Sequence, residues 1–305
     1  MNKIVILGSS GLLGLNLCLA LKKKYKIYPI VNKKKILIKN LKTKYLNIIK
    51  KDEIRKYLKR IKPKFLINCV AISNVEMCEK NKKLTYDINS ILASNIAKVC
   101  DELSIHYTFI SSDHLFSGNN FFYEENDRVF PLNNYAKSKV LAEKKIIENS
   151  NNYLIIRTNF FGFGPSYRKS FLDKIFENFK NKNQITLFCD VFYSPIYLIQ
   201  LIKIIDILLK NNVKGVFNVA GSKRLTKYQF GKKIAQKFKF EKKLLKKLYL
   251  KETVQKVLRP KDMSLSNKKI KKIIGNNSLF DLREGMIQLY KDYNSNYYKE
   301  IKSIK

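Results

Sequence analysis

Tyr135 and Lys139 are four residues apart in a stretch of the chain that has the pattern of a helix. On a helix, this spacing places both side chains on one face. A phenol can donate a proton to a carbonyl oxygen or accept one from an alcohol, and a nearby ammonium group lowers the pKa of the phenol toward a useful value. The pair therefore predicts acid–base catalysis of the interconversion of a carbonyl group and an alcohol.

The same spacing recurs at Tyr228 and Lys232, as chance predicts in a lysine-rich chain. The two pairs differ in their positions. Tyr135 begins the helix after a predicted strand at 107–111, and parallel α/β sheets bind their ligands outside the carboxyl ends of the strands. Tyr228 lies in a late helix that no comparable strand-end serine precedes. We therefore predict that Tyr135 and Lys139 are catalytic.

Hydroxyl groups follow the same predicted strand. Ser112 is the expected third catalytic residue, because its hydroxyl can donate a hydrogen bond to a substrate carbonyl. Ser111 is the alternative, but side chains alternate along a strand, so we expect it to face the other way. Asn89, in the predicted helix 84–103, either supports a proton relay through water or is a buried amide that binds the backbone.

Three glycines, Gly8, Gly11 and Gly14, follow an apolar run at 4–7 and open a predicted helix. Gly8 can make a tight turn, Gly11 lets the backbone approach a pyrophosphate, and Gly14 lets the helix pack closely on the strand. The helix N-terminus offers unpaired N–H groups and a partial positive charge to the anion. Incidental glycines in a structural turn are the alternative, but the chain has only 11 glycines. We predict a dinucleotide phosphate site formed by Gly8, Ser10, Gly11, Leu12, Leu13 and Gly14.

The predicted second strand, 27–31, ends without an acidic residue. Dinucleotide-binding domains that prefer NAD commonly have Asp or Glu there, bound to the ribose hydroxyls. Here Asn32, Lys33 and Lys34 follow the strand, and lysines can pair with the 2′-phosphate of NADP. The alternative is that these lysines only reflect a lysine-rich chain. We expect NADP(H) as the cofactor, with NAD(H) left open.

Short runs rich in Ile, Val and Phe alternate with longer helical stretches in the first half of the chain. Strands expected at 4–7, 27–31, 65–70, 107–111 and 153–158 alternate with helices expected at 12–23, 52–60, 84–103 and 134–149. This alternation is typical of a parallel sheet that helices cover on both faces. Together with the glycine turn, it predicts an α/β, doubly wound Rossmann fold.

The alternation ends near residue 158, where a Gly/Pro loop leads into mixed strands and helices. We expect an NAD(P)-binding Rossmann domain at 1–160, to which 190–223 returns, and a smaller substrate-binding part made of 161–189 and 224–305. No linker is long enough to separate two independent domains, and no internal repeat is visible.

Basic residues outnumber acidic residues by 61 to 24, for a formal net charge of +37. Such a charge can indicate binding to nucleic acid or to an anionic membrane. The lysines are spread over the whole chain, however, and arginine, the preferred residue for bidentate phosphate binding, is scarce beside lysine. We expect no nucleic acid and no membrane partner, although the charge could attract an anionic small substrate.

Five scattered cysteines without a Cys-x-x-Cys pair argue against a disulfide framework and against a structural zinc site. No cluster of metal-ligating residues is apparent, so we expect no metal. The N-terminus lacks the pattern of a signal peptide, and the longest apolar stretch, 196–209, is short and contains Lys203 and Asp206. The expected location is the cytoplasm.

With these features, the chain resembles the extended short-chain dehydrogenase/reductases, and within them the dTDP-4-dehydrorhamnose reductase branch. The similarity runs over nearly the whole chain and is carried by the segments 67–71, 86–89, 110–118, 131–135, 190–195 and 259–260. The resemblance implies that Cys69, Val70 and Ala71 line the nicotinamide ribose, that Asn89 belongs to the cofactor site, and that Lys139 holds the ribose.

The resemblance also implies NADPH-dependent reduction of the 4-keto group of a nucleotide-linked deoxysugar, in which Ser112 polarises the carbonyl and Tyr135 donates the proton. Positions near the sugar depart from the family pattern. The usual Thr is Ser112, the Tyr that follows Asp113 is His114, and the Trp expected after the fifth strand is Phe160, in a chain without Trp. We expect Ser112, Asp113, His114 and Phe160 to bind the substrate, and the departures leave the identity of the sugar open.

Two other functions remain open. A nucleotide-sugar epimerase of the same superfamily would keep its cofactor tightly bound. The regulatory subunit of methionine adenosyltransferase resembles the same branch and acts as a binding partner, but retention of Ser112, Tyr135 and Lys139 favours an enzyme. The family commonly pairs through helices, so a homodimer is one expectation for the oligomeric state.

Overall fold

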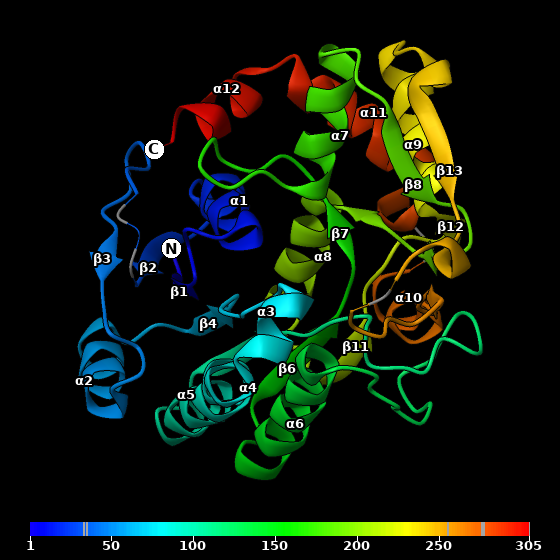
Figure 1. Cartoon of the computed structure of the whole chain (residues 1–305). Coiled ribbons are helices and arrows are strands. Elements are labelled where there is room, and N and C mark those ends of the chain that lie inside the picture. Colours follow the sequence, from blue (N-terminus) through cyan, green and yellow to red (C-terminus); the bar gives the residue numbers. More distant parts are fainter. Residues whose placement is uncertain (33, 35, 255, 276–277, 305) are drawn as a thin grey trace.

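The computed structural model describes residues 1–305 apart from 33, 35, 255, 276–277 and 305. Its centre is a seven-stranded sheet in the order β11-β6-β5-β4-β1-β2-β3, and every neighbouring pair is parallel (Figure 1). The strands are β1 (Lys3–Leu7), β2 (Lys26–Val31), β3 (Lys44–Tyr45), β4 (Phe65–Asn68), β5 (His106–Ile110), β6 (Tyr153–Arg157) and β11 (Gly215–Asn218). Strand order reverses between β1 and β4, and such a reversal opens a crevice for a ligand at the carboxyl ends of the strands.

Both faces of this sheet are apolar, because alternate residues of each strand point to opposite sides. Ile4 and Ile6 of β1 belong to one core cluster, whereas Val5 and Leu7 belong to the other. The first cluster includes residues of α1 (Leu12–Leu21) and α8 (Leu198–Lys210), and the second includes residues of α2 (Lys51–Ile61), α5 (Leu92–Glu102) and α6 (Asn134–Asn149). The predicted doubly wound α/β fold is confirmed.

The predicted helix 84–103 is not a continuous α-helix. It consists of α4 (Lys82–Tyr86), a π-helical segment η1 (Asp87–Ile91) and α5. Asn89 lies in this wider turn, donates a hydrogen bond to Ile72 O at 3.0 Å and accepts one from Ile72 N at 2.8 Å. π-helical turns inside α-helices often occur at functional sites.

The rest of the chain forms a second layer beside the sheet. Here β8 (Ile185–Phe188) pairs in parallel with β13 (Leu245–Leu248), and β9 (Phe192–Tyr193) lies between β12 (Leu225–Thr226) and β14 (Asp262–Met263). The helices of this part are α7 (Phe171–Lys180), α9 (Lys227–Phe238), α10 (Lys268–Ile274), α11 (Leu282–Tyr293) and α12 (Asn296–Ser303). β13 and β14 are short strands whose pairing partners lie far away in the sequence.

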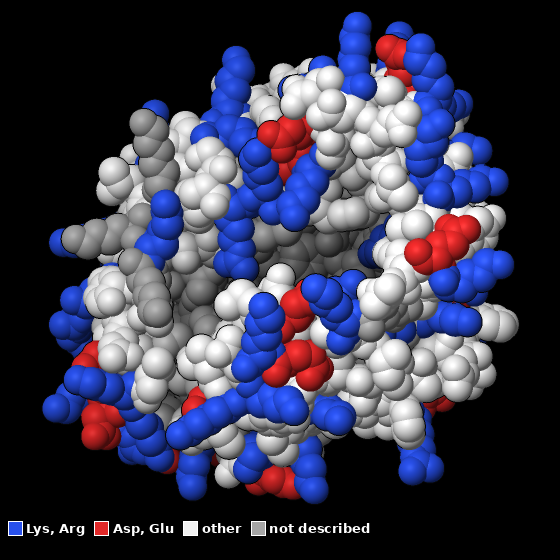
Figure 2. Space-filling model, viewed as in Figure 1, with Lys and Arg blue, Asp and Glu red and all other residues white. Residues whose placement is uncertain are grey.

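Lys and Arg side chains are scattered over the face shown in Figure 2, around a hollow near its centre. They do not gather into one stripe on this face. Among the helices of the described residues, none combines the length and the hydrophobicity that crossing a membrane requires.

Candidate active site

The glycine turn after β1 is tight and has little room for side chains. Gly8 has a φ of +78°, which an L-residue with a side chain rarely adopts. A Cβ atom on Gly14 would lie 2.3 Å from the carbonyl oxygen of Gly8, so α1 can approach the strand only because residue 14 is glycine. A Cβ atom on Gly11 would lie 3.2 Å from the same oxygen. These residues fit the pyrophosphate of a dinucleotide.

A cavity of about 860 Å³ begins at this turn and runs along the carboxyl ends of the strands. The residues that directly follow β1, β2, β4, β5 and β6 all line it: Gly8, Asn32, Cys69, Ser111 and Thr158. Strand ends that are distant in the sequence thus meet at one cavity, as expected for a parallel sheet.

Nearly all of the predicted site residues meet around this cavity. Its lining includes Gly8, Ser10, Gly11, Leu12, Leu13, Gly14, Asn32, Lys34, Cys69, Val70, Ala71, Ser112, Asp113, His114, Tyr135, Lys139 and Phe160. Lys33 lies outside the described residues. Asn89 does not line the cavity: its amide is bonded to Ile72 and, at 3.0 Å, to Ser138 Oγ, which favours the buried-amide alternative. The individual roles of these residues stay predictions.

The Ser112 hydroxyl lies beside Tyr135, close enough to change the pKa of the phenol. Burial raises the pKa of Tyr135 to about 12, the neighbouring Ser112 hydroxyl lowers it, and the carboxylate of Asp113 raises it further. At neutral pH the phenol therefore keeps its proton and can donate it to an oxygen atom that gains negative charge.

Lys139 shares the helical face of Tyr135, but its ammonium group is bonded elsewhere. Nζ donates to the carbonyl oxygen of Ile110 at 2.6 Å and lies 3.9 Å from the centre of the Phe109 ring. Burial lowers the pKa of Lys139 to about 7, partly offset by Glu143. Burial is the largest influence on the pKa of Tyr135, and the lowering of this pKa by Lys139 stays a prediction.

Ser111, the alternative catalytic serine, is bound to a buried carboxylate. Ser111 Oγ donates to Glu143 Oε1 at 2.5 Å, and Glu143 also accepts from the guanidinium of Arg157, with the shortest contact at 2.7 Å. Ser111 is thus tied to a buried ion pair beneath the cavity. Ser112 lines the cavity beside Tyr135, and its hydrogen bond to a substrate carbonyl stays a prediction.

Asp113 and His114 extend the site beyond Tyr135. Asp113 is buried and accepts a hydrogen bond from Asn159 Nδ2. The His114 ring stands edge to face with the Tyr135 ring, with 5.7 Å between the ring centres. Burial lowers the pKa of His114, the cations Lys227 and Arg259 act in the same direction, and Asp113 opposes them. The imidazole is therefore neutral at pH 7.

A second cavity of about 600 Å³ adjoins the first, and Val75 and His114 line both. Lys227, at the start of α9, lines the second cavity and lies 3.3 Å from the centre of the buried Tyr193 ring. Burial lowers the pKa of Lys227 to about 8, partly offset by Asp113. This lysine was missed in the sequence, because nothing distinguishes it from the surrounding lysines before α9 is placed beside the sheet.

Two further cavity residues, Thr158 and Asn159, were also missed. They directly follow β6, so the rule that parallel strands bind ligands at their carboxyl ends could have identified them. Thr158 Oγ1 is buried and has no hydrogen-bond partner in the described part of the chain.

Comparisons with known proteins agree with this geometry. Residues 1–295 match the family model described as RmlD substrate binding domain. The crystal structure of dTDP-4-dehydrorhamnose reductase from Bacillus anthracis in complex with NADP superposes with a TM-score of 0.84 at 25% sequence identity, covering 96% of this chain and 100% of that chain.

Two curated relatives represent different functions. The spore coat polysaccharide biosynthesis protein SpsK of Bacillus subtilis is 28% identical over 77% of this chain and 79% of its own length. The beta subunit of methionine adenosyltransferase 2 from Xenopus laevis is 24% identical over 62% of this chain and 59% of its own length. The match over residues 1–295, on a Rossmann sheet with the Ser112, Tyr135 and Lys139 side chains at one cavity, shows that the chain belongs to the RmlD family of the extended short-chain dehydrogenase/reductases.

Proposed function

We propose that this chain, an NAD(P)-dependent oxidoreductase by its family, uses NADPH to reduce the 4-keto group of a nucleotide-linked deoxysugar. The observation that carries the proposal is that Ser112 and Tyr135 lie together in a cavity that the glycine turn also lines. A proton donor and a dinucleotide phosphate site thus open into the same space, as carbonyl reduction requires.

The proposed role of each residue follows from its position in the cavity. When bound, the nicotinamide supplies the hydride. The N-terminus of α1 and the glycine turn would hold the pyrophosphate, and Cys69, Val70 and Ala71 would line the nicotinamide ribose, near Lys139. Ser112 donates a hydrogen bond to the substrate carbonyl, and Tyr135 donates the proton to the oxygen as negative charge develops there.

The preference for NADP(H) rests on the end of β2. The first residue after this strand is Asn32, which cannot repel a 2′-phosphate as a carboxylate would. Lys34 lines the same cavity and is exposed, so its ammonium group can reach an anion there. The related B. anthracis reductase was crystallised with NADP, which supports this preference.

The second cavity supports an anionic substrate. It adjoins the Tyr135 region through His114, and Lys227, Lys256 and Arg259 line it. Arg259 pairs with Glu76, whereas Lys227 forms no ion pair with a described residue. Cations of this kind suit the diphosphate of a nucleotide sugar bound with its keto group at Tyr135. Asp113, His114 and Phe160 would contact the sugar.

The pairing of strands in the central sheet bears on the division into domains. The strand β11 pairs with β6 in the central sheet, which supports the return of 190–223 to the Rossmann domain at 1–160. Residues 161–189 and 224–305 would then form the substrate-binding part. A homodimer and a cytoplasmic location stay predictions.

A coupled assay tests the function. dTDP-glucose is converted in situ to dTDP-4-dehydrorhamnose, the protein is added, and the absorbance of NADPH is followed. We expect rapid oxidation that depends on the keto-sugar; the corresponding UDP-linked 4-keto-sugar tests the choice of nucleotide. Binding of NADPH without oxidation by either sugar would contradict the reductase proposal and favour a binding partner like the methionine adenosyltransferase subunit. A cofactor that remains bound through purification would favour an epimerase.

A further inference from the structure

A loop from the second layer crosses the glycine turn. Residues 162–170 connect β7 (Phe160–Phe161) with α7 and pass close to α1 (Figure 1). The hydroxyl of Tyr167 donates a hydrogen bond to Ser10 O at 3.0 Å, and Lys34 Nζ lies 4.3 Å from the centre of the Tyr167 ring. The tip of this loop therefore contacts both segments that are predicted to bind the cofactor.

Arg168, the next residue, lines the main cavity with an exposed side chain. Its Nη1 lies 3.7 Å from the place that a Cβ atom would take on Gly11. No hydrogen bond or ion pair joins its guanidinium group to another described residue, whereas the adjacent Lys169 pairs with Glu177 at 2.6 Å. The positive end of the α1 dipole points into the same space. An unpaired arginine and a helix N-terminus that converge there repel each other unless an anion lies between them.

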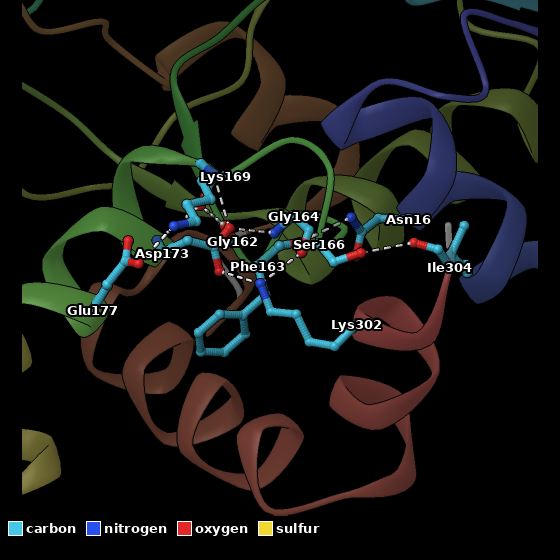
Figure 3. Close-up of polar contacts among 11 residues, drawn as sticks. Asn16, Gly162, Phe163, Gly164, Ser166, Lys169, Asp173, Glu177, Lys302 and Ile304 are labelled. Atoms are coloured by element: carbon cyan, nitrogen blue, oxygen red, sulfur yellow. Dashed lines mark hydrogen bonds and ion pairs between the residues drawn. The ribbon is translucent and has the colours of Figure 1, made fainter. Parts of the chain in front are cut away.

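A buried carboxylate, that of Asp173, holds the loop. Asp173 Oδ2 accepts hydrogen bonds from the backbone N–H groups of Gly164 and Ser170, both at 2.8 Å. Lys302, in α12, donates to Asp173 Oδ1 at 2.7 Å and to Gly164 O at 2.8 Å (Figure 3). Lys302 thus binds both the loop, at Gly164, and the carboxylate of Asp173 that holds it.

Three further hydrogen bonds connect the loop, α1 and α12. Ser166 Oγ donates to Ile304 O at 3.1 Å, just before the tip of the loop, and Asn16 of α1 donates to Phe163 O at 3.3 Å (Figure 3). The hydroxyl of Tyr297, in α12, donates to Asn16 Oδ1. The C-terminal helix, the loop and the cofactor-binding helix form one connected unit.

We propose that Arg168 binds a phosphate group of the dinucleotide, and that α12 positions it by holding the loop through Lys302. The inference rests on the proposed function, since it requires the cofactor in this cavity. The 2′-phosphate and the pyrophosphate share the required chemistry, and both lie within the region bounded by Gly11 and Lys34 in a dinucleotide-binding fold. Arginine suits either group, because its planar guanidinium can donate two hydrogen bonds to one phosphate.

Calorimetric titration with NADPH and with NADH tests the role of Arg168. We expect Arg168→Ala to raise the Kd for NADPH about tenfold or more, Arg168→Lys to recover part of the loss, and Lys174→Ala to change nothing. Lys174 is a matched control, because it is an exposed cation on the adjacent helix outside the cavity. An equal loss with NADH would identify the pyrophosphate as the partner; a loss with NADPH alone would identify the 2′-phosphate. Unchanged affinity for both dinucleotides would overturn the inference while leaving the reductase proposal intact, and a native chain that binds neither would contradict both.

Lys302→Met tests the positioning role, with the exposed Lys299→Met of the same helix as control. We expect Lys302→Met to weaken NADPH binding in the native background and to add little in the Arg168→Ala background, since both changes remove the same contact. Thermal melting shows whether each variant is folded. If the double variant loses as much NADPH binding free energy as the two single variants together, α12 does not act through Arg168.

Discussion

The ammonium group of Lys139 donates a hydrogen bond to the carbonyl oxygen of Ile110, 2.6 Å away, and only 1% of the lysine is exposed. Because burial disfavours the charged form, the pKa of Lys139 falls from 10.5 to about 7. Between these two values the folded chain releases a proton that the unfolded chain keeps. This lysine therefore makes the free energy of unfolding rise with pH across that window, and makes no further difference below it.

Lys139→Met removes this titration and retains a side chain of similar length. We expect the Tm of the variant, relative to that of the native chain, to be highest near pH 7 and to decline steadily toward about pH 10, where the native chain recovers its stability. Melting curves of both proteins across this range provide the measurement. A difference in Tm that does not change with pH would show that Lys139 titrates normally in the folded chain. Turnover should be lost at every pH, because Lys139 lines the active cavity.

Tyr135→Phe removes the hydroxyl group that is proposed to donate the proton. We expect kcat to fall by about 10²–10⁴-fold, the usual contribution of a general acid, while NADPH still binds. Tyr228→Phe is the matched control, since it makes the same change in another Tyr-x-x-x-Lys pair, which lies outside both cavities. Full activity in Tyr135→Phe would refute its assignment as proton donor.

The fold could be predicted because its signals are local. Parallel strands covered on both faces are continuous apolar runs, and the glycines at 8, 11 and 14 fix where the first strand turns into the first helix. The strand-end rule then brings Ser112 and Tyr135 to the same edge without knowledge of side-chain contacts. This is why most of the site residues predicted from the sequence line the cavity.

The parts that were missed depend on contacts between distant segments. Arg168 reaches the glycine turn only because the loop 162–170 is attached to α12, and Lys227 reaches the cavity only because α9 packs beside β8. In a chain with 61 basic residues, no local pattern marks these two. The sequence could not predict the direction in which the pKa of Tyr135 shifts, since this depends on how deeply the phenol is buried.

The double variant Lys33→Ala/Lys34→Ala tests the origin of the cofactor preference. If these lysines pair with the 2′-phosphate, the ratio of kcat/KM for NADPH to that for NADH should fall by about tenfold, with little change in the NADH value. Lys39→Ala/Lys42→Ala removes the same charge from nearby exposed positions and should leave the ratio unchanged. Equal ratios for the native chain and the first double variant would refute this origin of the preference.

Because of His114, we expect kcat/KM to fall at acid pH. Burial lowers its pKa below the ordinary 6.5, Lys227 and Arg259 lower it further, and only Asp113 opposes them. The ring is therefore neutral at pH 7, and acquires a charge beside Tyr135 only when the pH falls through this lowered value. We expect kcat/KM for the keto-sugar to decline there, because a cation next to Tyr135 disturbs the binding of the sugar. His114→Tyr, which introduces the residue that the family usually has, should retain turnover and lose this acid limb. An identical limb in the native chain and the variant would assign the titration to another group.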